Sequence, residues 1–138
     1  MSDVGFGISG AAVTRAADAM LRSLGADEVS LVFAATGVPN DPSVQLGLVD
    51  PGVVEVSFSP VVVRRLAAAG DGPRIRQEFL LGGSAVAATV VDRDVASAQM
   101  LFDSALGVMH DGKLLHIESV TTEYFAGTAY LYRVVGVE

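Results

Sequence analysis

The chain of 138 residues has no cysteine and no tryptophan, and Lys113 is its one lysine. The absence of cysteine excludes disulfides, thiol catalysis and thiolate metal sites, and it fits a protein made in the cytoplasm. No apolar run reaches the roughly 18 residues that a membrane-spanning helix needs. No basic segment precedes a hydrophobic run near the N-terminus. We therefore expect neither a membrane span nor a signal peptide.

Positive charge is scarce as well. Nine basic residues against sixteen acidic residues give a net charge of −7. Proteins that grip nucleic acid need cations to replace the counterions along the phosphates, so we expect no sequence-specific contact with DNA. An acidic surface can still line a passage through which DNA slides without sticking. What the chain does have is a high apolar fraction of 51%, which indicates a dense core or an apolar surface covered by a partner.

The length and the pattern of the chain predict a single domain of residues 1–138, mainly β with an N-terminal α-helix. Residues 1–8 are expected to form a flexible arm, and residues 9–25 a helix. Residues 28–138 are expected to form a β-rich body with a long loop at 36–52. The predicted architecture is a small antiparallel β-barrel or sandwich with long loops.

The helix prediction depends on its caps and on one apolar stripe. Ser9 is a plausible N-cap and Gly25 a plausible stop. The pattern GFGISG at 5–10 matches the dinucleotide-binding glycine motif, but too few residues precede it for the strand that the motif requires. We therefore expect no nucleotide there. The residues of the stripe are Val13, Ala16, Ala17, Met20, Leu21 and Leu24.

Several strands follow from runs of β-branched and aromatic residues. Pro60 interrupts one run, which predicts an edge strand, a bulge or a break at that point. Ser84 could cap a short helix. The short apolar run at residues 100–102 fits the spacing of a helix as well as that of a strand, and we favour a strand there. The predicted strands are 28–35, 53–66, 74–81, 114–120 and 128–137.

The segment MHDGKLLHIESV at 109–120 holds both histidines of the chain. Its Asp-Gly pair at 111–112 predicts a two-residue hairpin turn of type I′. We expect His110 and His116 to lie on the wetter face of this hairpin, with Glu118 beside His116. Metal sites usually need three or four protein ligands, so we expect no metal, no cofactor and no catalysis. The alternative is a small ligand-binding barrel or enzyme that uses His110, His116 and Glu118.

Two groups of residues are candidates for contacts with a partner. Four arginines lie near one end of the hairpin predicted from strands 53–66 and 74–81. We favour salt bridges with neighbouring acids for them, and the alternative is a contact with an acidic surface of a partner. An apolar patch in the long loop either packs over the core or meets a partner. The candidate contact residues are Arg64, Arg65, Arg74, Arg76, Val44, Leu46 and Leu48.

The C-terminal half of the chain resembles the small head–tail connector proteins of long-tailed bacteriophages. The resemblance is to the head-completion or stopper family, and less closely to the tail terminators. An EFLL strand is followed by DSALGVMHDGKLLHIESV and by a closing strand TAYLYRVVGVE. The residues that carry the match are Gly112, Ile117, Val120, Tyr130, Tyr132 and Arg133.

The resemblance implies a small β-barrel or sandwich without catalytic activity. It implies a virion structural protein that is made in the host cytoplasm and located in the neck of the particle. Its partners would be further copies of itself in a ring, together with the portal or adaptor and the tail proteins. DNA would pass through this ring without sequence-specific binding, and no membrane would be involved.

Overall fold

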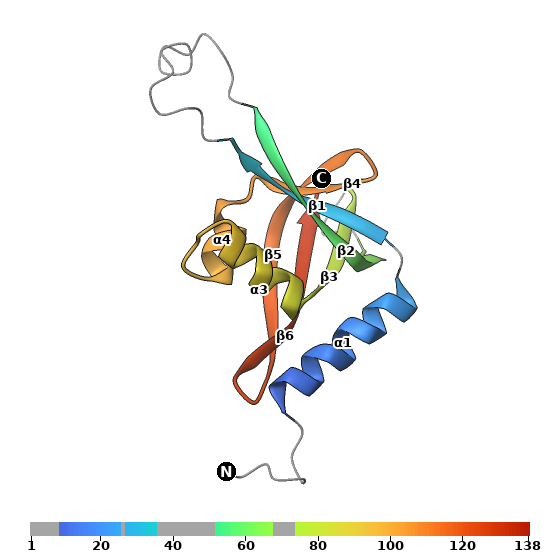
Figure 1. Ribbon diagram of the computed structural model, residues 1–138. Coiled ribbons are helices and arrows are strands. Elements are labelled where there is room, and N and C mark those ends of the chain that lie inside the picture. The colour runs from blue at the N-terminus through green and yellow to red at the C-terminus, as the bar shows by residue number, and fades with distance from the viewer. Residues whose placement is uncertain (1–8, 26, 36–51, 68–73) are drawn as a thin grey trace.

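In a computed structural model, the residues described are 9–25, 27–35, 52–67 and 74–138. Six antiparallel strands close into a barrel in the order β1–β2–β3–β6–β5–β4, with three helices outside it (Figure 1). The mainly β fold with an N-terminal helix is thereby confirmed. The strands are β1 Asp27–Ala34, β2 Val53–Arg65, β3 Arg76–Gly82, β4 Gly107–His110, β5 Lys113–Phe125 and β6 Thr128–Val137, and the helices are α1 Gly10–Leu24, α3 Gly83–Asp92 and α4 Ala98–Ser104.

Part of the predicted loop at 36–52 and the predicted arm at 1–8 lie outside the described residues, as do the candidate contacts Val44, Leu46 and Leu48. The strands predicted at 28–35, 53–66, 74–81, 114–120 and 128–137 are confirmed, with ends that differ by up to five residues.

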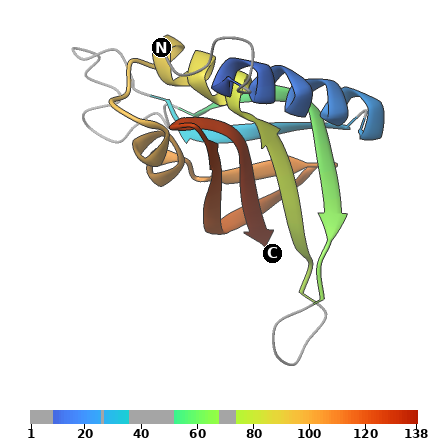
Figure 2. The same ribbon diagram turned by 90° about the horizontal axis from the view of Figure 1, so that it is seen from below.

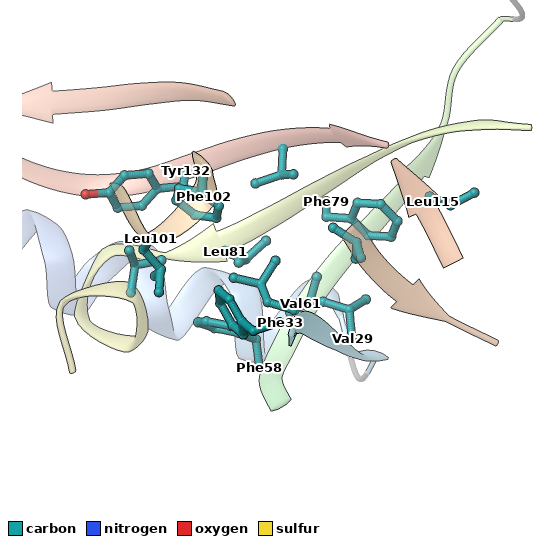
Figure 3. Packing of buried hydrophobic residues seen from close by; sticks show 14 residues of the cluster. Val29, Phe33, Phe58, Val61, Phe79, Leu81, Leu101, Phe102, Leu115 and Tyr132 are labelled. Carbon is teal, nitrogen blue, oxygen red and sulfur yellow. The ribbon is translucent and has the colours of Figure 1, made fainter. Parts of the chain in front are cut away.

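Large apolar side chains fill the interior of the barrel (Figure 3). The alternation along β1 turns Val29, Leu31 and Phe33 inward, and all three are buried. β6 lies between β3 and β5 and is apolar on both faces, as expected of a strand inside a barrel. Burial of whole Leu, Phe and Val side chains is the main stabilising contribution, at about 1.5–3 kcal/mol for each.

Helix α1 lies across the outer face of the barrel (Figure 2). Its N-cap is Ser9, as predicted, and the Ser9 hydroxyl accepts a hydrogen bond from the backbone N–H of Ala12 at 3.1 Å. Leu21 is 1% exposed and packs against Leu80 of β3 and Leu131 of β6. This contact explains why Leu131, on the outward face of β6, is apolar.

The predicted apolar stripe of α1 is only partly correct. Met20 and Leu24 belong to that stripe, yet they are 46% and 69% exposed. The helix is turned so that Asp18 faces the barrel, where its carboxylate accepts a hydrogen bond from the Ser84 hydroxyl at 2.6 Å. Ser84 therefore does not cap α3, whose N-cap is Gly82, and instead ties α3 to α1. This hydrogen bond adds to the packing of the buried Ala17 and Leu21 in holding α1 against the barrel.

Helices α3 and α4 close one end of the barrel. The predicted strand at 100–102 is wrong, because these residues belong to α4. The Ser97 hydroxyl accepts a hydrogen bond from the backbone N–H of Met100 at 3.2 Å and starts the helix. The helical period then buries Leu101 and Phe102 while Met100 stays 53% exposed. A short apolar run fits the spacing of a helix as well as that of a strand, and here the N-cap at Ser97 favours the helix.

Strand β2 changes partner along its length. Its first part pairs with β1, and pairing with β3 begins only at Val62. The bulge expected from Pro60 is confirmed: Asp27 of β1 faces Val61, whereas Val29 faces Phe58, so the register shifts between these pairs and β2 holds the extra residue. β2 continues through Pro60 without a break. The Ser59–Pro60 peptide bond is cis.

Candidate functional site

His110 lies in the open mouth of the barrel, at the end opposite to α3 and α4. Its imidazole packs edge-on against the Phe79 ring, with ring centroids 5.7 Å apart, and its side chain is 9% exposed. The prediction that His110 decorates the wetter face of the hairpin is therefore wrong. The reason is the turn itself: His110 pairs with Lys113, and Val108 pairs with Leu115. Cross-strand partners share a face, so His110 points inward with Leu115.

The mouth holds a pocket of about 210 Å³ with charges of both signs. The His110 Nε2 atom is buried without a hydrogen-bond partner, 3.7 Å from an Asp27 carboxylate oxygen and 3.9 Å from one of Asp111. Lys113 Nζ lies 3.5 Å from a Glu138 carboxylate oxygen. Sites for small molecules usually span roughly 300–1,000 Å³, so this pocket has room for a small ion or a few waters. Its lining residues are Arg65, Ile75, Gln77, His110, Asp111, Lys113 and Leu115.

His116 and Glu118 lie on the outside of the barrel, away from His110. The Arg76 guanidinium holds Glu118 through two hydrogen bonds, from Nε at 3.1 Å and from Nη2 at 2.8 Å. These bonds from Arg76 lower the pKa of Glu118, and the same contact raises the pKa of Arg76. The candidate trio of the alternative function is therefore not brought together. Within residues 9–25, 27–35, 52–67 and 74–138, no group of three metal-ligating side chains forms.

The four candidate arginines do not form one surface. Arg64 pairs with Glu78 at 3.4 Å on the outer face, and Arg76 pairs with Glu118. Arg65 turns the other way and lines the mouth. The expected salt bridges with neighbouring acids thus exist for Arg64 and Arg76. Arg74 is exposed, and in the described part of the chain no carboxylate lies within ion-pair distance of it or of Arg65.

A row of charges across four strands was not predicted from the sequence. Arg133 of β6 lies 3.2 Å from a Glu123 carboxylate oxygen and 3.7 Å from one of Glu78. Together with Arg64, these residues alternate in sign across β2, β3, β6 and β5. The side chain of Glu78 is 14% exposed, and both guanidinium groups approach its Oε1 without hydrogen-bond geometry. Only the strand order places these residues in one row, so no local motif could have indicated it.

A second feature is the apolar end, which we define as the exposed large apolar side chains on the side of the barrel where α3 and α4 lie. In Figure 1 the β1–β2 ribbon lies at the upper left, the two helices at the left and the β5–β6 turn at the bottom, so these side chains are spread along that side of the barrel. Tyr124 is 67% exposed and Val91 is 76% exposed. The residues of the apolar end are Val53, Val54, Val91, Met100, Leu106, Tyr124 and Phe125.

Tyr132, in contrast to the exposed Tyr124, is 8% exposed. Tyr132 packs beside Phe102 with ring centroids 5.6 Å apart. Burial, and secondarily the neighbouring Tyr124, raise the pKa of Tyr132. A raised pKa keeps this phenol neutral and disfavours a role as a base. The Arg93 guanidinium lies 3.9 Å from the centroid of the Phe33 ring.

No family model, curated protein or solved structure matches the chain. Among the described helices, none is long and apolar enough to span a membrane.

Proposed function

We propose that the protein is a non-enzymatic structural component of a bacteriophage virion. In this proposal it is a neck protein whose copies form a ring between portal and tail, around the channel through which DNA passes. The observation that carries the assembly is the apolar end. Contiguous exposed apolar surface is characteristic of interaction sites, and in this proposal the side chains of the apolar end act together as one such surface. The neck position rests on the resemblance of the C-terminal half to head-completion proteins.

The barrel interior has little free space, which supports a function that is performed by the outer surface. The interior is filled by its own side chains, including Phe33, Phe58 and Phe79. The mouth pocket of about 210 Å³ is smaller than usual sites for small molecules. Binding energy is therefore more readily obtained from the apolar end than from the interior.

Native mass spectrometry and analytical ultracentrifugation over a range of protein concentrations test the assembly. We expect a closed oligomer for the wild type and monomers for the double variant Tyr124→Ser, Phe125→Ser. Leu24→Ser is the matched control, because it removes an equally exposed apolar side chain from α1. A wild type that stays monomeric at all concentrations would overturn the ring. If the double variant assembles like the control, the apolar end is not the surface that holds the oligomer together.

The neck position is tested in cells that produce the particles. Replacing the gene with that for the Tyr124→Ser, Phe125→Ser variant should yield filled heads and free tails, visible separately by electron microscopy. Normal tailed particles would contradict the proposal, provided that the variant is as thermally stable as the wild type. The matched Leu24→Ser gene should give normal particles.

A further inference from the structure

Two strands of the barrel are longer than their pairing on one side. β5 pairs with β4 only through residues 113–115, and the rest of the strand pairs with β6 alone. On β2, residues 53–58 have partners on β1 alone. A strand paired on one side directs the N–H and C=O of every second residue toward its open side. The barrel is closed in strand order, yet its described strands leave two open edges.

The β5 edge is suited to accept a further strand. Between its two bulges, residues 119–123 keep a regular register with β6. Their sequence SVTTE is rich in β-branched residues and has none of the Pro or Lys residues that commonly protect an edge. A groove of about 350 Å³ lies between α4 and residues 117–120 of β5, where this edge begins. Its lining residues are Gln99, Phe102, Asp103, Ala105, Ile117, Glu118, Ser119 and Val120.

The β2 edge is suited to be the strand that is added. The β1–β2 ribbon extends away from the barrel, at the upper left of Figure 1. Val53 and Val54 on it are 58% and 40% exposed, and Glu55 is exposed too. Its segment VVEVS at 53–57 also lacks Pro and Lys. Because the ribbon projects, its open edge can reach a neighbouring molecule without distorting the barrel that carries it.

We infer that residues 53–57 of one copy pair with residues 119–123 of the next copy and extend the sheet across the boundary between subunits. The occupant is a second copy because one chain carries both halves of the contact. The two halves differ, so the contact is head-to-tail, and head-to-tail contacts that close generate rings. Pairing of β5 with β5 would be self-complementary and would stop at a dimer. This inference rests on the proposed ring and specifies how its subunits join.

The absence of native cysteines makes a cross-linking test specific. Glu55→Cys and Thr121→Cys are prepared as single variants, mixed, and treated with the short thiol cross-linker bis-maleimidoethane. Facing residues on adjacent strands have Cβ atoms about 4.5–5.5 Å apart, which lies within reach of this reagent. We expect cross-linked dimers in the mixture and none with either variant alone. Leu24→Cys mixed with Thr121→Cys is the matched control and should give no dimers.

The outcomes separate the inference from the proposed function. Dimers of Thr121→Cys alone would overturn the head-to-tail pairing in favour of β5 with β5. A wild-type ring in native mass spectra without any cross-link in the mixture would refute the edge pairing and leave the ring intact. A wild type that never assembles would refute both. As a second variant, Thr121→Lys places a charge on the edge, opposite Arg133 of β6. It should abolish assembly while the far-ultraviolet circular dichroism spectrum stays that of the folded wild type.

Discussion

Substitution of Gly112 isolates the backbone requirement of the hairpin turn. Asp111 and Gly112 have φ values of 49° and 76°, as a type I′ turn requires. A Cβ atom added at Gly112 would meet no atom within 4 Å. Backbone strain is therefore the main cost of Gly112→Val, because the added Cβ atom meets no clash. A β-branched residue in this region costs about 1–3 kcal/mol.

Gly112→Asn is the informative companion, because asparagine tolerates left-handed backbone far better than valine does. We expect Asn to lose less than half of what Val loses. For a domain of this size, each kcal/mol lowers the melting temperature by roughly 3–5 °C. The chain lacks tryptophan, so unfolding is best followed by far-ultraviolet circular dichroism in urea and on heating.

The turn at 126–127 provides an internal repeat of the measurement. Ala126 and Gly127 have φ values of 50° and 77°, and the space around Gly127 is equally open. Gly127→Val should therefore cost as much as Gly112→Val. Equal stability of the Val and Asn variants at position 112 would refute the argument from strain. Unchanged unfolding of Gly112→Val would mean that the turn adopts another conformation.

Three further changes follow from the described contacts. Gly83→Ala should destabilise strongly, because its Cβ would collide with the Ala129 carbonyl oxygen, and no loss in urea unfolding would contradict that close approach. His110→Ala should cost about 1–2 kcal/mol through the lost contact with Phe79, whereas His116→Ala, exposed on the same hairpin, should change nothing in the same assay. The lowered pKa of Glu118 stabilises the fold above the pKa of an unfolded glutamate, and this contribution is lost as the pH falls through the lowered value. The melting temperatures of wild type and Glu118→Gln should therefore differ at neutral pH and converge in acid, and a constant difference would contradict the ion pair.

The elements of this fold are largely predictable from local pattern. Helix α1 follows from its cap and its apolar spacing, and the strands follow from β-branched runs and turn dipeptides. The face of each element is less predictable, because it depends on partners far away in sequence. Asp18 shows this: its polar side chain lies beside the buried Ala17 and Leu21, and its partner there is Ser84 at the start of α3. Residue 84 is 66 positions away, beyond any local window.

The site at the barrel mouth was accessible to sequence reasoning but was not found. A two-residue turn at 111–112 makes residues 110 and 113 direct partners, and partners share a face. Leu115 is buried, so His110 had to point inward with it. Beyond Ile117 the same alternation fails. The bulge at Glu118 shifts the register, which turns Val120 inward, and no feature of the sequence marks that bulge.

Several of the few basic side chains already have partners within the structure. Arg64, Arg76, Arg133 and Lys113 lie in ion pairs, and Arg93 lies over the Phe33 ring. A cation already held by a carboxylate must leave that partner before it can neutralise a phosphate, so it contributes little to counterion release. The acidic side chains still outnumber the basic ones across the chain. The described surface is therefore poorer in available positive charge than the composition alone indicates.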